Sequence, residues 1–354
     1  MNAPRLPLPL AGEGRGEGVP SVPRRDESPF HAGEIMLQRR AGVHERLAEI
    51  GERVIRDHMP EQHRELFRKL TTLIVGSVDA ARRPWASILV GAPGFIHDLD
   101  AYRLRVEALP GHGESLAEHL ALGASIALLG LEPQTRRRNR MNGRVTSLDA
   151  HGFEVRAEQS FGNCPQYIQA RTPTWVSDRA RGVRPRPIAQ GGAHLSDTAK
   201  ALIRAADTFF IASAAAPSDP AKTPRNGGVD VSHRGGRPGF VRVDDTPNGS
   251  VLTVPDFRGN FFFNTLGNIV AHPYAGLLFI DYEHGGLLQI AGRALVIEGG
   301  DEVRQFEGAQ RLLRIAVERS VWSQEALPLR WSAPEPAPQL ASTGVWAETA
   351  TAGT

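Results

Sequence analysis

Cysteine is almost absent from this sequence, because Cys164 is the only one among 354 residues. A single thiol excludes an internal disulfide bond and any metal site built from several cysteine ligands. The 12 histidines do not show a metal-binding spacing such as HExxH, so we expect no metal site. A nucleophilic cysteine needs a nearby base and a lowered pKa, and the sequence around Cys164 supplies neither. We therefore interpret Cys164 as a buried structural thiol.

The sequence also lacks a surplus of charge and long apolar runs. Its 41 basic and 39 acidic residues give a net charge of +2, which leaves no overall footprint for nucleic acid. The arginine-rich stretch 134–140 has no interleaved aromatic residues, so it is more typical of a solvated loop than of an RNA-binding patch. No run of 18 apolar residues could span a membrane, and proline interrupts the short N-terminal run LPLPL, which argues against a signal peptide. We therefore expect a cytoplasmic protein without nucleic acid or membrane partners.

The sequence does contain a series of strand-like segments that occurs twice. The first half has them at 71–78, 84–90, 102–108, 124–131, 142–147 and 153–159, and the second half at 208–213, 240–243, 251–254, 276–280 and 289–296. In both halves a polar residue, Arg140 or Gln289, stands three positions before a Gly-Arg pair. An internal duplication of two six-stranded antiparallel barrels explains this order. Apolar residues at helical spacing predict peripheral helices at 42–59, 196–206 and 301–317.

Composition divides the chain into five parts. Residues 1–28 are rich in proline, glycine and charge and are expected to be a disordered tail. Residues 29–178 form the first barrel half with an N-terminal helix, and a Pro/Gly/Arg-rich linker follows at 179–195. Residues 196–331 form the second half. Residues 332–354, rich in proline, alanine and threonine, are expected to be a second disordered tail.

Polar and basic residues gather in two stretches of the second half, SHRGGRPGF (Ser232–Phe240) and DFRGNFFFNTLGNI (Asp256–Ile269). The strand-like run 260–263 ends in side-chain donors and a tight turn, a suitable lining for a phosphate. Two alternatives stay open: SHRGG forms a hairpin turn, or the asparagines and threonine cap a short helix. The candidate anion-binding residues are Ser232, His233, Arg234, Arg237, Arg258, Asn264, Thr265, Gly267 and Asn268.

These stretches resemble the FMN-binding split-barrel proteins related to pyridoxamine 5′-phosphate oxidase, in particular their long bacterial flavin-nucleotide-binding branch. The resemblance runs from SPFHAGE (28–34) to ALPLRW (326–331) and is best at 161–171, 230–240 and 255–273. It implies a mainly β fold with peripheral helices (α+β), built as tandem split β-barrels of the FMN-binding type. In the family, a Ser/Arg/Lys turn grips the FMN phosphate. Here Leu-Gly-Asn (266–268) occupies that turn, so the phosphate charge would be met by Arg234, Arg237 or Arg258.

The resemblance further implies an FMN-binding flavoprotein, an oxidoreductase whose partner is a small-molecule substrate or a transient nicotinamide donor. Gln289 is expected near the flavin ring edge, and Arg138 and Arg140, which alternate on one strand face, near the flavin of the second half. One flavin per chain would then have its phosphate held by the second barrel. Three alternatives stay open: a carrier or sensor of FMN without turnover, a deazaflavin in place of FMN, and a structural protein without cofactor. Pairing of whole chains into a homodimer also stays open.

Overall fold

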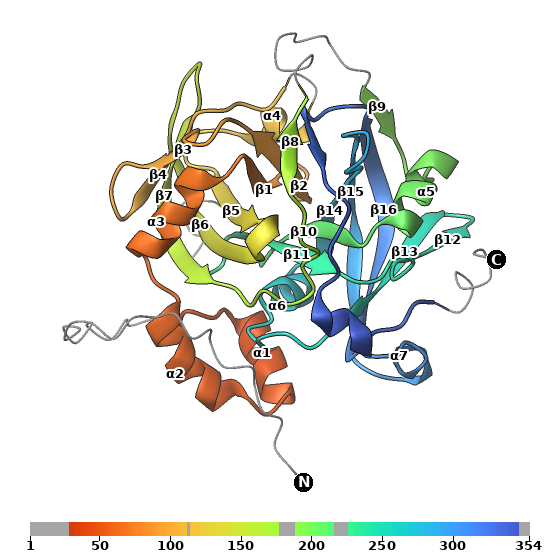
Figure 1. Cartoon of the computed structure of the whole chain (residues 1–354). Coiled ribbons are helices and arrows are strands. Elements are labelled where there is room, and N and C mark those ends of the chain that lie inside the picture. Colours follow the sequence, from red (N-terminus) through yellow and green to blue (C-terminus); the bar gives the residue numbers. More distant parts are fainter. Residues whose placement is uncertain (1–27, 112–113, 177–187, 216–225, 347–354) are drawn as a thin grey trace.

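Most strands in the described part of the chain belong to two curled antiparallel sheets that have the same order (Figure 1). A computed structural model describes residues 28–111, 114–176, 188–215 and 226–346. The first sheet, in the order β2-β1-β5-β6-β7-β4-β3, contains β1 (Thr72–Val78), β2 (Pro84–Val90), β3 (Ile96–Asp98), β4 (Arg103–Val106), β5 (Ser125–Glu132), β6 (Arg137–Leu148) and β7 (Phe153–Gly162).

The second sheet follows the order β11-β10-β14-β15-β16-β13-β12, with β9 paired to β16. Its strands are β9 (Ile188–Gly191), β10 (Thr208–Ala214), β11 (Val229–Gly235), β12 (Arg242–Thr246), β13 (Gly249–Asp256), β14 (Tyr274–Ile280), β15 (Leu287–Ile297) and β16 (Arg311–Ser323). Each strand of the first sheet therefore has a counterpart at the same place in the second. The mainly β fold with tandem split barrels is confirmed, with seven strands in the shared order instead of the expected six.

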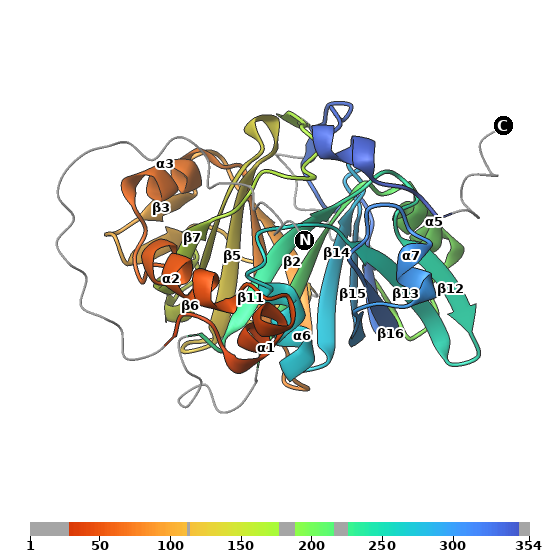
Figure 2. The ribbon, with the colours of Figure 1, turned by 90° about the horizontal axis from the view of Figure 1, so that it is seen from below.

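Helices cover the edges of both sheets. They are α1 (Ala32–Arg40), α2 (His44–Val54), α3 (Glu61–Lys69), α4 (Ser115–His119), α5 (Asp197–Ala205), α6 (Asn264–Ala271) and α7 (Asp301–Arg304), with 3-10 turns η1 (Pro133–Thr135) and η3 (Pro338–Ser342) and a small pair of strands, β8 (Pro173–Trp175) and β17 (Leu329–Trp331). Figure 2 shows α1 lying against α6 where the two sheets meet. Among the described residues, no helix is both long and apolar enough to cross a membrane.

The register of the strands shows how closely the two halves correspond. Arg140 on β6 pairs with Leu129 on β5, and Gln289 on β15 pairs with Leu278 on β14. The register of each pair then shifts at the same place, directly before Gly143 or Gly292, where the partner strand, β7 or β16, carries one extra residue. Arg140 and Gln289 therefore hold equivalent positions, as the sequence predicted.

Side chains along β1 and β10 point alternately into the core of their own barrel and into a third core between the two barrels. Leu73 and Val75 on β1 face the core of the first barrel, whereas Ile74 between them faces the second barrel. Its counterpart Phe210 on β10 belongs to the same interface core. Strands buried on both faces are apolar at nearly every position, which is why these segments stand out in the sequence. At Gly276 on β14 an added Cβ would lie 2.3 Å from the Pro84 carbonyl oxygen, so a glycine is needed for the barrels to approach this closely.

Two helix predictions need correction. The helix expected over 301–317 is wrong, because only α7 forms there and the thirteen-residue strand β16 begins at Arg311. Leu313, Ile315 and Val317 point into the second core at every second position, a strand period that adjacent apolar residues disguised. The helix expected over 42–59 ends earlier, at Val54, and α1 and α3 flank it. The helix expected over 196–206 is confirmed as α5, with the Ser196 hydroxyl accepting from the Ala199 N–H at 3.2 Å.

Three extended or unstructured segments also differ from expectation. The counterpart of β2 is β11, not the segment 240–243, because SHRGG continues a strand that pairs along β10. The run 260–263 is a loop leading into α6, not a strand, and Phe261 and Phe263 in it have positive φ values of 63° and 62°. Of the expected C-terminal tail, residues 332–346 contact both halves: Glu335 pairs with Ala170 of the first half, and Trp346 is buried against Phe306 of the second. The expected linker includes β9, whereas its residues 179–187, the N-terminal residues 1–27 and the last residues 347–354 lie outside the described part.

Candidate functional site

A cavity of about 120 Å³ opens where the two barrels meet, and residues of both line it. The first barrel contributes β6 and the loop after β7. The second barrel contributes β11, the loop 257–263, the start of α6 and the start of β16. Its lining includes Arg138, Arg140, Cys164, Tyr167, Ser232, His233, Arg234, Asp256, Phe257, Arg258, Phe261, Phe263, Asn264, Thr265 and Arg311.

Two arginines of the first barrel reach into this cavity from β6. Arg138 and Arg140 are two residues apart, so their side chains share one strand face. The Arg138 Nε donates to the backbone carbonyl of Cys164 at 2.8 Å. Arg140 donates across the barrel interface, to the Ser232 hydroxyl at 2.9 Å and to the Asn264 side-chain oxygen at 3.2 Å. This face of β6 therefore contacts the second barrel directly.

Alternate residues on β11 continue the polar wall. Asp230 forms an ion pair with Arg140, with 2.8 Å between Nη1 and Oδ1, and both side chains are almost fully buried. Arg234 forms an ion pair with Asp256 at 2.8 Å, and Arg311 stands 3.8 Å from the other oxygen of the same carboxylate. Among the described residues, the cavity lining holds five arginines and one carboxylate, that of Asp256. Even with Asp230 counted, cations exceed anions there by three.

Burial lowers the pKa values of three basic side chains in the cavity lining. Burial, and then the nearby Arg140, lower the pKa of Arg138 to about 9. Burial also lowers the pKa of Arg140 and holds the pKa of His233 well below its ordinary value, so that imidazole is neutral. Among the described residues, the Nε atoms of Arg140 and Arg311 lack a hydrogen-bond partner. An anion in the cavity would relieve the charge repulsion and supply acceptors to these donors.

Aromatic side chains form the apolar part of the wall. Tyr167 stacks on Phe257 with ring centroids 5.1 Å apart, and the Arg311 guanidinium lies 4.8 Å from the centroid of the Phe263 ring. At the rim, Phe261 is partly exposed and Gly259 is exposed. A ligand larger than the inner cavity can therefore extend over the 258–261 loop toward solvent.

The structure brings together eight of the twelve residues predicted to bind the cofactor. They are Arg138, Arg140, Ser232, His233, Arg234, Arg258, Asn264 and Thr265. Arg237 lies elsewhere and donates to the Leu340 carbonyl of η3. Gly267 packs against α1, and Asn268 donates to the buried Ser213 hydroxyl at 3.1 Å. The twelfth residue, Gln289, lies outside this cavity.

Gln289 fills the position that the duplication makes equivalent to the cavity. Its side-chain nitrogen donates to the hydroxyls of Ser87 and Ser115, at 2.9 and 2.8 Å. Ser87 is the counterpart of Ser232 in strand register, and Ser115 begins α4 as Asn264 begins α6. Arg140 and Gln289 thus make corresponding contacts at two related places. The Gln289 amide nitrogen forms hydrogen bonds within its place, whereas Arg140 lines an open cavity.

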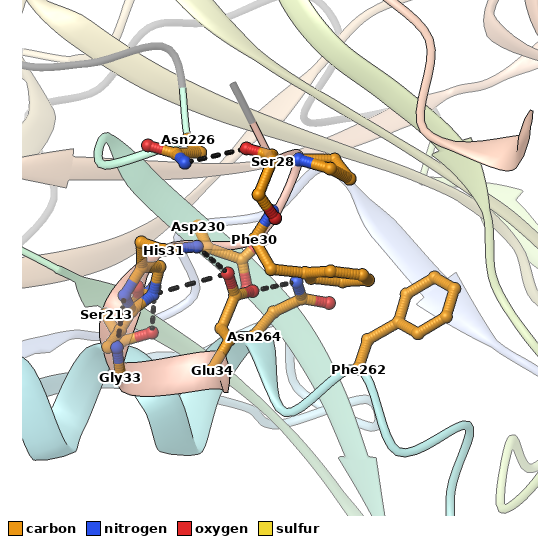
Figure 3. Close-up of polar contacts among 12 residues, drawn as sticks. Ser28, Phe30, His31, Gly33, Glu34, Ser213, Asn226, Asp230, Phe262 and Asn264 are labelled. Atoms are coloured by element: carbon orange, nitrogen blue, oxygen red, sulfur yellow. Dashed lines mark hydrogen bonds and ion pairs between the residues drawn. The ribbon is translucent and has the colours of Figure 1, made fainter. Parts of the chain in front are cut away.

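Sequence reasoning missed Asp230, Arg311 and Glu34. Asp230 and Arg311 lay in segments whose secondary structure was assigned incorrectly. Glu34 comes from α1, and its carboxylate accepts a hydrogen bond from the Asn264 side chain (Figure 3). It lines a second, smaller cavity of about 20 Å³ together with His31 and Asp230. The motif SPFHAGE, which carries His31 and Glu34, was the available indication. No group of three or more His, Cys, Asp or Glu side chains within the described ranges could hold a metal ion.

Comparison with known proteins gives only distant likenesses. No protein-family model and no curated protein sequence matches the chain. Similar solved structures include the HupZ protein of Group A Streptococcus (16% identity, 37% of this chain and 95% of that one, TM-score 0.28) and HutZ, the heme storage protein from Vibrio cholerae (13%, 37% and 95%, TM-score 0.24). A candidate pyridoxamine 5′-phosphate oxidase from Lactobacillus delbrueckii is also similar (15%, 36% and 93%, TM-score 0.27). Identities and TM-scores this low identify neither a ligand nor an activity.

Proposed function

We propose that this chain is an FMN-binding flavoprotein whose phosphate site is the arginine-lined cavity between the barrels, and that it acts as an oxidoreductase on a small molecule. The observation that carries the proposal is the surplus of arginines over carboxylates around one cavity, where Arg140 is buried and the other four arginines are partly buried. Burying a cation without a counter-charge costs several kcal/mol, so such a surplus favours a bound anion. A phosphate group, with two negative charges and several acceptor oxygens, fits this donor set.

Different groups of cavity residues would bind different parts of such a ligand. Arg138, Arg140 and Arg234 surround the inner cavity and would neutralise the phosphate. The start of α6, with Asn264 and Thr265, adds uncharged polar groups beside it. The partly exposed rim and the aromatic wall suit a flat ring system that extends outward from the phosphate. Bound flavin would supply the redox chemistry, while these side chains bind and orient it and exclude water.

We expect one flavin per chain. At the equivalent place in the other half, the neutral Gln289 is only 5% exposed, and its side-chain nitrogen donates to two serine hydroxyls and a backbone carbonyl. The first barrel provides Arg138 and Arg140 as one wall, and the second provides the rest. Flavin per chain, measured by absorbance after denaturation, together with molar mass by light scattering, tests this stoichiometry and also shows whether whole chains pair.

The direct test compares FMN with riboflavin, which has the same ring system but no phosphate. The purified protein is scanned for flavin absorbance, and any released cofactor is identified by mass spectrometry, which also distinguishes FMN from a deazaflavin. The apoprotein is then titrated with each compound. We expect FMN to bind at least tenfold more tightly than riboflavin, since each charge-assisted hydrogen bond contributes about 1.5–3 kcal/mol. Equal affinities would refute a phosphate site.

A pair of arginine variants locates the site. Arg234→Ala removes a cavity arginine and should weaken FMN binding about tenfold or more. Arg237→Ala removes an arginine of the same segment that contacts Leu340 and should leave the affinity unchanged. Equal effects of the two substitutions would place the phosphate outside this cavity.

Turnover separates the oxidoreductase from the second candidate, a carrier or sensor that holds FMN without reaction. The discriminating measurement is reduction of the bound flavin by NADH or NADPH, followed by reoxidation. Reduction that is no faster than for free FMN would favour the carrier. The partly exposed 258–261 rim is the feature that would give a donor or substrate access to the ring.

A further inference from the structure

Helix α1 comes from a distant part of the sequence, yet it supports the loop that lines the cavity. The Gln38 side chain donates to the Phe262 carbonyl at 3.3 Å, and the Phe30 ring meets the Phe262 ring edge-on at 5.3 Å. On either side of Phe262, Phe261 and Phe263 have left-handed φ values, which cost energy for residues with a side chain. The loop therefore depends on contacts from outside, and α1 together with Phe30, just before it, provides them.

The approach of α1 to α6 is as close as backbone atoms allow. An added Cβ at Gly33 would lie 2.3 Å from the Gly267 carbonyl oxygen, and one at Gly267 would lie 2.7 Å from both the backbone nitrogen and Cγ of Glu34. Two glycines thus let the start of α1 lie directly on the first turn of α6. This contact carries the Glu34 carboxyl group into the interior, where its side chain is about 5% exposed.

Glu34 is held at both oxygens. One accepts from the His31 backbone N–H at 2.8 Å, which completes a capping box at the start of α1. The other accepts from the Asn264 side-chain nitrogen (Figure 3). Because an arginine can only donate, the Asn264 oxygen must face Arg140, and its nitrogen must then face Glu34. The order Glu34–Asn264–Arg140 is fixed by the donor and acceptor character of its members.

We propose that α1 is part of the ligand site and that Glu34 is a positioning residue there: by orienting Asn264 it aims Arg140 at the anion, so that anion affinity depends on Glu34. The inference rests on the proposed anion-binding function. Arg140 has three of its contacts in place, with Asp230, Ser232 and Asn264, and only its Nε lacks a partner among the described residues. An anion that accepts from this atom would be bound by a guanidinium already fixed in place.

The protonation of Glu34 gives this arrangement a measurable signature. Burial raises the pKa of Glu34 to about 8, with the nearby Asp230 adding to the rise and Arg140 opposing it. The other titratable groups facing Glu34 are His31 of the same helix, whose pKa burial lowers to about 4, and Glu158 of β7, which shares the small cavity and pairs with Arg144. Glu34 is therefore neutral at pH 7. As the pH rises through about 8 it gains a negative charge beside Arg140, which competes with a bound anion.

The experiment titrates FMN and, separately, inorganic pyrophosphate into the full-length protein by calorimetry at pH 7 and pH 9. For the wild-type protein we expect affinity to fall about tenfold between these values, the effect of one buried charge near the cavity at an effective dielectric constant of about 20. Glu34→Gln keeps a neutral acceptor for Asn264 and should bind as the wild type does at pH 7. At pH 9 it should lose less affinity than the wild type, because the partial deprotonation of Arg138 acts on both proteins but the charge on Glu34 is gained only by the wild type. Glu34→Ala removes the acceptor and should bind about tenfold more weakly at both. Glu45→Gln removes an exposed carboxylate of α2 and serves as the control, with the wild-type pH profile.

The outcomes separate this inference from the proposed function. A Glu34→Gln profile that falls with pH as the wild type does, or full affinity in a folded Glu34→Ala protein, would overturn the role of Glu34 while FMN binding stands. Pyrophosphate binding with the expected pattern but no FMN binding would overturn the flavin proposal and support the role of Glu34. If neither compound binds the wild-type protein, both proposals are wrong.

Discussion

The buried ion pair between Arg140 and Asp230 offers the sharpest test of how the barrel interface is built. The two side chains are 3% and 5% exposed, and 2.8 Å separates Nη1 from Oδ1. Removing one partner of such a pair leaves an uncompensated buried charge, which typically costs about 3–5 kcal/mol. We therefore expect Arg140→Gln to lower the free energy of unfolding by that amount at pH 8.

The pH dependence of this loss follows from Asp230. Burial already raises its pKa, and the loss of Arg140, which opposes the rise, would raise the pKa further. A carboxyl group whose pKa is higher in the folded than in the unfolded state costs nothing at low pH, where it is protonated in both states. The cost grows as the pH rises toward the folded-state pKa. Arg140→Gln should therefore be less destabilised at pH 5 than at pH 8.

A double-mutant cycle completes the test. Asp230→Asn in the Arg140→Gln background removes the orphaned charge, and a glutamine at 140 can donate to Ser232 as Gln289 donates to Ser87. The double variant should regain most of the lost stability, to within about 1 kcal/mol of the wild type, yet bind FMN at least tenfold more weakly. Urea denaturation followed by tryptophan fluorescence measures each variant. A loss below 1 kcal/mol for Arg140→Gln, equal at pH 5 and 8, would refute the buried pair.

Three further substitutions test other parts of the structure. Gly267→Ala should destabilise the fold by about 1–3 kcal/mol and weaken FMN binding, because its Cβ meets Glu34, whereas Gly259→Ala, whose Cβ meets nothing within 4 Å, should be neutral in urea denaturation. Gln289→Ala should cost about 1–3 kcal/mol by leaving its serine partners without their donor, with no change in FMN affinity by titration. The pKa of Glu34 rises from 4.5 to about 8 on folding, so the wild-type protein should lose up to about 5 kcal/mol of stability as the pH rises between these values. Glu34→Gln should lack this loss. Unfolding curves of both proteins at pH 5 and 8 make the comparison.

The duplicated strand order could be predicted because the paired strands at the barrel interface are buried on both faces. Segments such as β1 and β10 are then apolar at nearly every position and recognisable without long-range information. The equivalence of Arg140 and Gln289 was visible for a related reason. Each stands three positions before a glycine that lies opposite an extra residue of the neighbouring strand, and such a register shift constrains the local sequence.

The helix predicted over 301–317 failed because local spacing does not report which side of a segment is covered. On β16, Leu312 and Leu313 are adjacent and both buried, which imitates a helical face. Its pairing with β9, β13 and β15 decides the outcome, and that pairing involves residues far away in the sequence. The strand β11 was missed for the opposite reason: Ser232, His233 and Arg234 are polar, and only the cavity beside them explains polar residues within a buried strand.

Most residues of the candidate site could be predicted from the sequence, but the helix α1 that contacts them could not. The arginines of β6 and the polar start of α6 are conspicuous in the sequence. The contribution of α1 is not, because Glu34 lies 230 residues before Asn264 and their hydrogen bond depends on the close contact of two glycines. Arg237 was included by proximity to Arg234, yet the turn after β11 directs it to η3. Proximity in the sequence therefore pointed to Arg237, whereas the arginine that lines the cavity in the fold is the distant Arg311.

The neighbours of Arg140 and Gln289 explain why one of these equivalent positions holds an arginine and the other a glutamine. In strand register, Asp230 corresponds to Trp85, which is buried and donates to Asp79. An arginine at position 289 would therefore meet an indole where Arg140 meets a carboxylate, and burial without a counter-charge would oppose it. A neutral glutamine avoids that cost and needs only two serine hydroxyls and a carbonyl oxygen as partners. The presence of a carboxylate on one strand and an indole on its counterpart thus decides which place can bury an arginine, and with it which place can attract an anion.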